Sequence, residues 1–399
     1  MSAEAPDPTR PSRRRFLATG AVGVAGAVAG LAGGYALGTA AGAGGEAAER
    51  DAATPAATAS GAAAELVDPH GAHQAGIARP QLLQRQLQLA VLDLDDVPIA
   101  ELAARLDACG KTIADLCAGE HPGLGGLAPA RLTVTIGVGG RIVSTAFGGA
   151  LGWTDLPAFS RDDIPDDRRD GDVLVLCRSD DGAVAALARD AVIAGLGGRA
   201  RWTASGFTSA ADGPATRNLV GFHDGISLPQ AAAELDESVW LADGAASGGS
   251  IAVVRVMPID TAAFTALDLH AQEAAVGRTR STGAPLSGGA ASDDPDLNAK
   301  SAAGVFDIPV DAHVRRAHPL PTGLDGLMMR RSYAYSNGPD DQGAIFVSFQ
   351  RSAGYFIRTQ QRLDESDALL AHTRTTASGA FLILPGFTAE HGLGRALLP

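Results

Sequence analysis

The first regular stretch of the chain is residues 86–94, QLQLAVLDL, in which apolar and polar side chains alternate. This alternation is typical of a β-strand with one buried face. The next segment, residues 99–116, has apolar residues at near-helical spacing and predicts a helix. The folded part of the chain is therefore expected to begin with a strand followed by a helix.

The remaining periodic segments extend this pattern into two similar halves. In the first half, strands are predicted at 131–138, 172–178 and 200–208 and a helix at 183–196. In the second half, strands are predicted at 250–257, 327–335, 344–351 and 380–384, and helices at 261–276 and 355–372. Each half has the β-α-β-β-α-β order of a ferredoxin-like unit. The sequence predicts an α+β fold in which two such units, 65–220 and 221–399, pack their sheets face to face with helices outside, as a dimeric α+β barrel or sandwich.

The N-terminal segment has the features of a targeting signal. Residues 12–17, SRRRFL, form a twin-arginine pattern, and residues 17–45 are an uncharged stretch rich in Gly, Ala and Val. The stretch is long enough to anchor the protein in a membrane, but its low content of Leu, Ile and Phe favours a cleavable signal. We therefore expect residues 1–45 to direct export of the folded protein to the periplasm or outside the cell, attached to the cell envelope, and residues 46–64 to be a disordered linker. Export in the folded state suits a protein that acquires a cofactor before it crosses the membrane.

Charge and cysteine content restrict the partners. A net charge of -13 and a pI near 5.1 exclude nucleic acid, because the phosphate backbone would repel this protein. The cysteines are Cys109, Cys117 and Cys177, an odd number that argues against a disulfide scaffold. We interpret all three as small buried apolar residues.

Three short motifs contain candidate site residues. His313 lies in DAHVRR, residues 311–316, where it is either a metal-ligating imidazole or a surface histidine among arginines. Asp224 lies in GFHDG, residues 221–225, which also fits an ordinary Asp-Gly turn. Arg330 and Arg331 are adjacent on a predicted strand, so only one of them can face a buried site.

Taken together, these motifs resemble those of the dye-decolourising peroxidase family. The family's Gly-x-x-Asp-Gly signature matches 221–225, its proximal histidine motif matches His313, and its distal arginine matches Arg330. The resemblance implies a haem peroxidase that reduces hydrogen peroxide and oxidises dyes or other small reductants, with one haem b per chain. It implies that His313 binds the haem iron and that Asp224 and Arg330 are catalytic. The further haem contacts that it implies are Gly225, Ile226, Ser227, His318, Pro319 and Leu320.

Within the family, the leader and the opening sequence HQAGI, residues 73–77, are most similar to the exported deferrochelatase/peroxidase branch of bacterial iron uptake. An alternative function is therefore haem handling, in which iron is released from haem and peroxidase activity is incidental. This branch would add iron-uptake components as partners, and a homo-oligomer is also compatible with the sequence. A second alternative is a non-enzymatic periplasmic metal binder that uses His70 and His73, although no further cluster completes such a site.

The chain departs from the family pattern in three places. After the glycine signature the family usually has Thr and a small residue, whereas this chain has Ile226 and Ser227. Residues 317–320 read AHPL where the family often has Ala-Asn-Pro-Arg, so Leu320 replaces an arginine that could contact a haem propionate. The carboxylate that the family's last helix supplies to the proximal histidine falls, by spacing, on Ala371. Without an anionic partner the imidazole would donate less electron density to iron, so we expect a raised reduction potential and slow cleavage of the O–O bond.

Overall fold

A computed structural model describes residues 65–151, 153–209, 215–320 and 325–398. The predicted signal segment, 1–45, and the predicted linker, 46–64, lie outside the described residues. Among the described residues, no helix has both the length and the apolar character needed to cross a membrane.

The N-terminal unit contains the predicted β-α-β-β-α-β order. Its strands β2, β3, β1 and β4 are neighbours in that order, and all pairs are antiparallel. A short helix that the sequence analysis missed, α4 (Gly140–Phe147), directly follows β2. The other elements are β1 (Gln86–Asp93), α3 (Ile99–Ala118), β2 (Thr133–Gly139), β3 (Val173–Ser179), α5 (Gly182–Leu196) and β4 (Arg199–Phe207).

The C-terminal unit repeats this order with interruptions. The predicted helix at 261–276 is two helices, because the Asp268 side chain accepts a hydrogen bond from the Ala271 backbone N–H (2.8 Å) and caps a new helix. The predicted strand at 327–335 is broken between β8 and β9, and the predicted helix at 355–372 ends at Ser366. The elements are β7 (Ser250–Pro258), α7 (Thr261–Thr265), α8 (Leu269–Val276), α9 (His313–Ala317), β8 (Met329–Arg330), β9 (Tyr333–Gly338), β10 (Asp341–Gln350), α10 (Ala353–Ser366) and β11 (Ala377–Ile383).

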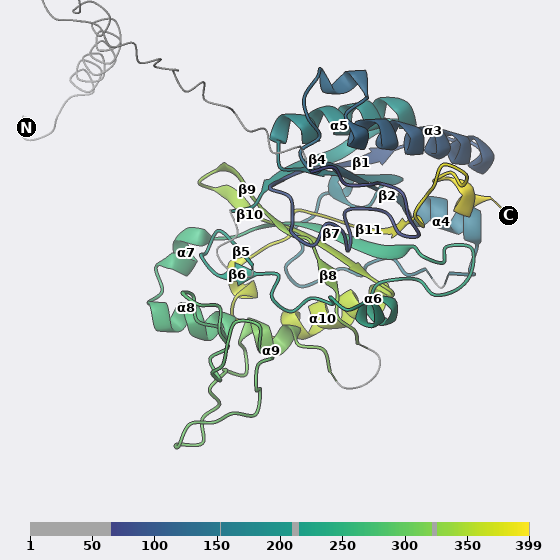
Figure 1. Cartoon of the computed structure of the whole chain (residues 1–399). Coiled ribbons are helices and arrows are strands. Elements are labelled where there is room, and N and C mark those ends of the chain that lie inside the picture. Colours follow the sequence, from purple (N-terminus) through teal and green to yellow (C-terminus); the bar gives the residue numbers. More distant parts are fainter. Residues whose placement is uncertain (1–64, 152, 210–214, 321–324, 399) are drawn as a thin grey trace, which may run out of the picture. The chain divides into compact units, whose positions relative to one another are not determined.

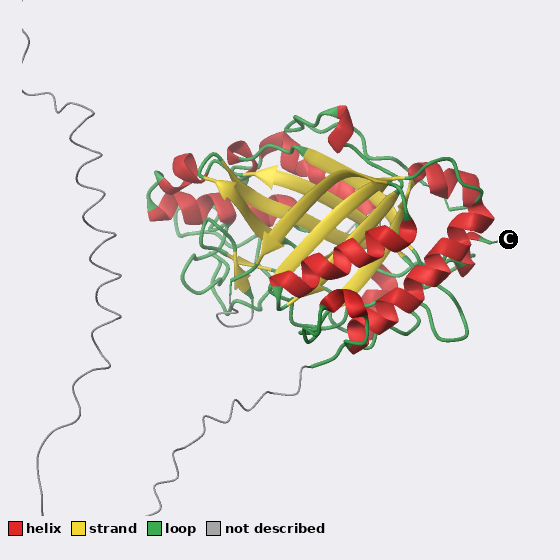
Figure 2. Cartoon of the chain, turned by 90° about the horizontal axis from the view of Figure 1, so that it is seen from above, coloured by secondary structure: helices red, strands yellow, loops and turns green. Residues whose placement is uncertain are grey.

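The two sheets face each other across a shared core, as predicted, and they also join edge to edge. Strand β11 pairs with β2 and strand β9 pairs with β4, while β10 pairs with β7 inside the second unit. The hydrogen-bonded order β7-β11-β2-β3-β1-β4-β9-β10 therefore returns to β7 and closes a barrel. Closure pairs the outer edges of both sheets, which would otherwise expose unpaired backbone groups. Of the two predicted arrangements the structure shows the barrel, with the helices outside the strands (Figures 1 and 2).

Alternate side chains of β1 and β3 fill two different cores. Leu89 of β1 and Leu176 of β3 point into the barrel, whereas their neighbours Ala90 and Val175 pack under α3 and α5. The three cysteines belong to this second core or its border and are free and buried, as predicted. Burial raises the pKa of the Cys109 thiol to about 12, which keeps it protonated and unreactive.

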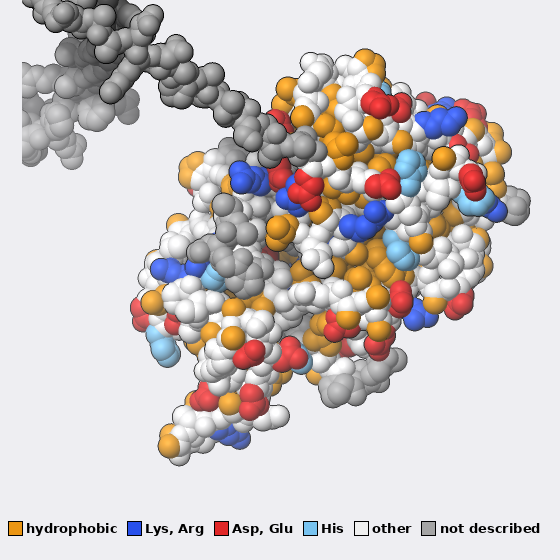
Figure 3. Space-filling view, viewed as in Figure 1, with side chains coloured by type: hydrophobic (Ala, Val, Ile, Leu, Met, Phe, Trp, Pro, Cys, Tyr) orange, Lys and Arg blue, Asp and Glu red, His pale blue; other side chains and the backbone are white. Residues whose placement is uncertain are grey.

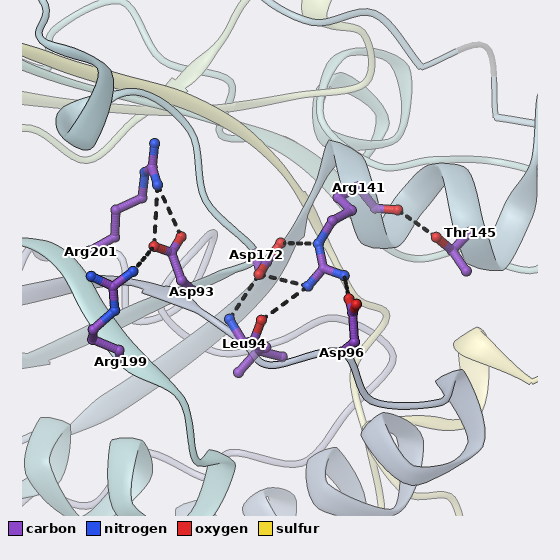
Figure 4. A network of polar contacts seen from close by, with 8 residues as sticks. All are labelled: Asp93, Leu94, Asp96, Arg141, Thr145, Asp172, Arg199 and Arg201. Carbon is purple, nitrogen blue, oxygen red and sulfur yellow. Dashed lines mark hydrogen bonds and ion pairs between the residues drawn. The ribbon is translucent and has the colours of Figure 1, made fainter.

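A polar network ties together the strand ends of the N-terminal unit (Figure 4). The Arg141 guanidinium donates two hydrogen bonds of 2.7 Å to the Asp172 carboxylate, which also accepts the Leu94 backbone N–H at 2.8 Å. The Asp93 carboxylate accepts hydrogen bonds from Arg199 and Arg201. These contacts fix the ends of β1, β3 and β4 relative to α4.

Outside the regular elements, the longest irregular segment lies between α8 and α9, at residues 277–312. It projects away from the strands at the bottom of Figure 1 and includes acidic residues such as Asp293 and Asp294. Acidic side chains are visible on this projection in the space-filling view (Figure 3). The segment begins and ends at the helices that border the cavity described next.

Candidate active site

A cavity of about 310 Å³ lies between the strands of the C-terminal unit and its helices. This volume is within the usual range of small-molecule sites. Much of its wall is apolar and comes from both layers, including Met257 and Phe346 from the strands and Phe356, Leu363 and Leu370 from α10 and the turn after it.

His313 is the first residue of α9 and lines this cavity. Its Nδ1 atom lies 2.7 Å from Oδ2 of Asp367. The Asp367 side chain is completely buried, whereas 39% of the His313 side chain is exposed. Since Nδ1 is engaged by the carboxylate, Nε2 is the ring nitrogen left for a ligand.

Electrostatics at His313 reflect both its burial and its partner. Burial alone would lower the pKa of His313, but the Asp367 carboxylate outweighs this effect and the pKa is raised. Arg330 acts to lower this pKa and Asp224 to raise it. Both residues line the same cavity as His313. The histidine and the two predicted catalytic residues therefore belong to one site.

The carboxylate partner of His313 corrects the sequence analysis, which placed this position on Ala371. Helix α10 ends one residue before Asp367, and the Asp367 side chain turns back to accept the Leu370 backbone N–H at 2.7 Å. Its second oxygen then faces His313. Because a buried anion is present after all, the expectation of a raised reduction potential and slow O–O cleavage loses its physical basis.

Asp224 reaches the cavity from a short hairpin. Strands β5 (Thr216–Arg217) and β6 (His223–Asp224) pair so that Thr216 lies opposite Asp224. Gly221 and Gly225 have φ angles of 86° and 84°, a conformation that glycine adopts without strain, so the hairpin can turn tightly on both sides of Asp224. Within the described ranges, the Asp224 carboxylate has no hydrogen-bond partner and remains available to a ligand.

Arg330 and Arg331 point in opposite directions, as predicted. Arg330 lines the cavity, and its guanidinium has no acceptor among the residues that the structure describes. Arg331 is 5% exposed and donates to the backbone carbonyls of Ile77, Pro80 and Gln81 at 2.7–2.8 Å. Arg331 therefore secures the segment that precedes β1, and of the two adjacent arginines only Arg330 lines the cavity.

Comparison with known proteins agrees with this geometry. Residues 74–208 match the N-terminal model, and residues 215–388 the C-terminal model, of the Dyp-type peroxidases. The chain belongs to the Dyp-type peroxidase family. Members of this family are haem peroxidases, so the protein is an oxidoreductase that acts on peroxide and a reducing substrate.

Individual relatives cover most of the chain. A dye-decolorizing peroxidase of Thermobifida fusca is 34% identical over 324 residues, 75% of this chain and 74% of that protein. A deferrochelatase of Yersinia pseudotuberculosis is 30% identical over 374 residues, 82% of this chain and 84% of that protein. The solved structure of ferric DtpA from Streptomyces lividans has a TM-score of 0.78 at 31% identity and covers 84% of this chain and 97% of its own.

The cavity of this Dyp-type peroxidase has the chemistry that haem requires. It offers an imidazole whose Nδ1 is oriented by a buried carboxylate and apolar walls for a flat ring system. It also offers the Asp224 carboxylate and the Arg330 guanidinium, neither of which has a partner among the described residues. Gly225, Ile226, Ser227, His318 and Pro319 line the same cavity, as the resemblance implied. Leu320 does not line it and is 46% exposed.

Two residues of the site were missed by the sequence analysis, the buried partner of His313 and a residue of the cavity lining. Asp367 was assigned to a helix interior. Arg278 follows α8 in the irregular segment, is 6% exposed, and donates to the backbone carbonyls of Gly283 (2.8 Å) and Ala291 (3.0 Å). Burial lowers the pKa of Arg278. No local pattern identified Arg278, because its burial depends on how this loop folds back on itself.

The proposed metal pair has no shared site. His70 Nδ1 lies 3.0 Å from Asp68 Oδ1, whereas His73 stacks on Trp240 and its Nδ1 lies 2.7 Å from the Gly248 carbonyl oxygen. Over the described part of the chain, no group of three or more His, Cys, Asp or Glu side chains is arranged to hold a metal ion.

Proposed function

We propose that His313 would hold the iron of a haem b group and that Asp224 and Arg330 are the catalytic residues of this peroxidase. The observation that carries the proposal is the 2.7 Å contact of Asp367 with His313, which shares a cavity with the Asp224 carboxylate and the Arg330 guanidinium. Neither of these two groups has a partner within the part of the chain that the structure describes. Gly225, Ile226, Ser227, His318 and Pro319 would form the wall that contacts the haem. Bound haem would supply the iron that takes up peroxide and accepts its oxidising equivalents.

The residues of the chain would then control protons and charge. Asp224 would accept a proton from one oxygen of hydrogen peroxide and return it to the other, so that water can leave. Arg330 would donate hydrogen bonds to the charge that develops as the O–O bond breaks. Asp367, held by the Leu370 backbone N–H, would keep the His313 ring in one orientation throughout.

The test measures the rate of reaction with hydrogen peroxide in haem-loaded Asp224→Asn and Arg330→Leu. A general acid–base residue contributes about 10²- to 10⁴-fold and a charge-stabilising donor about 10²- to 10³-fold, so losses of at least about 100-fold are expected. Arg351→Leu is the matched control, since Arg351 is exposed and outside the cavity lining. Unchanged rates in both variants would remove the two residues from the mechanism. His313→Ala is expected to lose the Soret band.

We further propose that the protein is exported folded through the twin-arginine pathway and acts in the periplasm or outside the cell. The proposal is supported by residues 12–17, SRRRFL, and the uncharged stretch after them. Replacing Arg13 and Arg14 with Lys should retain the protein in the cytoplasm, as cell fractionation would show. An unchanged distribution would contradict the export route.

A second candidate function is release of iron from haem, with iron-uptake components as partners. It is supported by the deferrochelatase relatives at 30% identity over 374 residues. Incubation of the haem-loaded protein under reducing conditions, followed by analysis of the extracted pigment, separates the two functions. Recovery of metal-free porphyrin would favour iron release, and recovery of intact haem would favour the peroxidase alone. A homo-oligomer remains a prediction that size-exclusion chromatography would test.

A further inference from the structure

A second cavity, a cleft of about 790 Å³, lies where strands β4 and β9 separate. The two strands pair only at Phe207 and Ala334. Close to this point, Gly206 has no side chain, and a Cβ added there would lie 2.7 Å from the Cβ of Tyr333. Farther from this pair the strands diverge, and Ser205 of β4 and Asn337 of β9 both line the cleft.

The cleft and the haem cavity lie on opposite faces of the same strands. Val256, Pro258 and Tyr335 line the cleft, whereas their chain neighbours Met257 and Ala334 line the haem cavity. Because successive side chains of a strand point to opposite faces, the two cavities are separated by a single layer of sheet. A molecule bound in the cleft would therefore lie one strand thickness from the haem site without entering it.

Two arginines give the cleft unused hydrogen-bond donors. Arg168 donates through Nε to the Thr376 carbonyl oxygen at 3.0 Å, and no acceptor is recorded for its two terminal nitrogens among the described residues. The Arg374 side chain is exposed and has no hydrogen-bond or ion-pair partner within the same ranges. Planar guanidinium groups of this kind bind carboxylates and sulfonates through paired hydrogen bonds.

The carboxylates of the cleft leave these donors available. The two oxygens of Asp341 accept hydrogen bonds from the Tyr335 hydroxyl and the Asn337 side-chain amide, each at 2.9 Å. The Asn337 hydrogen bond and the positive charges of Arg168 and Arg374 lower the pKa of Asp341, so it stays ionised and engaged at neutral pH. Asp163, the other carboxylate of the lining, is exposed to solvent.

We propose that the cleft between β4 and β9 is a second binding site for aromatic anions, meaning compounds in which a carboxylate or sulfonate is attached to a ring. Arg168 and Arg374 hold the anionic group, and the ring lies against Val256 and Tyr335. Compounds bound here are reducing substrates that need not enter the haem cavity. This part of the inference rests on the proposed peroxidase function.

Binding is tested without peroxide, by isothermal titration of naphthalene-1-sulfonate into the haem-loaded protein. Arg374→Gln is expected to raise the Kd at least five-fold, because it removes the charge and the paired donors. Arg351→Gln is the matched control, an exposed arginine outside the cleft, and should leave the Kd unchanged. Naphthalene-1-methanol, which lacks the anion, should bind more weakly than the sulfonate to the wild-type protein. The proposal is overturned if the sulfonate shows no saturable binding, or if Arg374→Gln binds it as tightly as the wild type.

Turnover then tests whether the bound compound is a substrate. The KM for 4-hydroxybenzenesulfonate divided by the KM for phenol should rise at least five-fold in Arg374→Gln and stay constant in Arg351→Gln. An unchanged ratio would refute the substrate part. If the wild-type protein binds the sulfonate but does not react with peroxide, the proposed function is refuted and the binding site stands.

Discussion

Asp367→Asn is the sharpest test of the haem-ligand assignment. The wild-type carboxylate uses one oxygen to accept the Leu370 N–H and the other to face His313 Nδ1, both at 2.7 Å. Asparagine has nearly the same shape but only one acceptor oxygen, so it can satisfy only one of these two contacts. If it keeps the Leu370 bond, its NH₂ group faces Nδ1 and forces the ring proton onto Nε2, the nitrogen that must bind iron.

The size of the effect follows from the burial of Asp367. A hydrogen bond to a charged group is worth about 1.5–3 kcal/mol, and loss of the partner of a metal-bound histidine costs about 10- to 100-fold in affinity. Haem affinity should therefore fall by about 10- to 100-fold. If the affinity for ferric haem falls more than the affinity for ferrous haem, the reduction potential should rise by about 60 mV for each tenfold difference between the two losses.

The assays are haem titration followed at the Soret band and a reductive titration of the loaded protein. Asp364→Asn is the matched control, because Asp364 lies in the last turn of α10 and its carboxylate accepts hydrogen bonds from the Ser160 backbone N–H and the Gln360 side chain, not from His313 or Leu370. If affinity and potential are both unchanged in Asp367→Asn, the contact with Asp367 does not orient an iron ligand, and the assignment of His313 fails.

Two further predictions concern stability. Gly277→Ala should destabilise the fold and weaken haem binding, because Gly277 has a φ of 90° and a Cβ there would collide with Val314 of α9. Gly304→Ala is the control: Gly304 has a φ of 80° and open space around it, so this variant should incur only the backbone cost of about 1–2 kcal/mol. Thermal unfolding and haem titration of both variants measure the effect of the contact with α9. Equal losses of stability and of haem affinity in the two variants would show that this contact has no effect. Burial alone would raise the pKa of Asp172, but the hydrogen bonds from Arg141 and Leu94 outweigh this effect and the pKa is lowered. The ionised carboxylate therefore stabilises the fold at pH values above its unfolded pKa of about 3.9, and this stabilisation is lost as the pH falls through its folded pKa. Urea unfolding between pH 2 and pH 6 should therefore show a shallower pH dependence in Asp172→Asn than in the wild type, and identical slopes would contradict the stabilising role of the network.

The strands were the most predictable part of the fold. Both β1 and β3 are short, largely apolar segments of strand length, and they lie within one residue of the segments expected for them. The closure of the barrel was not predictable to the same degree, because the pairing of β4 with β9 depends on two edges about 130 residues apart and involves a single residue pair. The same weak pairing opens the cleft, which no local pattern could have indicated.

The candidate site was predictable where a short motif contains the residue. His313, Asp224 and Arg330 each lie in such a motif, and the structure brings all three to one cavity. Leu320, inferred only from its position in the family pattern, lies outside the lining. A contact made by a side chain beyond a helix end depends on where that end falls, which periodicity locates poorly.

The wrongly predicted end of α10 and the wrongly predicted carboxylate partner of His313 have one cause. A helix continuing through residue 372 would place Asp367 in its interior, where its carboxylate could not accept the Leu370 N–H, since that N–H would bond within the helix. Ending α10 at Ser366 frees Asp367 to cap the following turn with one oxygen and to face His313 with the other. The residue that stops the helix therefore also orients the proposed iron ligand, so a substitution that extends α10 by one turn should weaken haem binding even if it leaves His313 untouched.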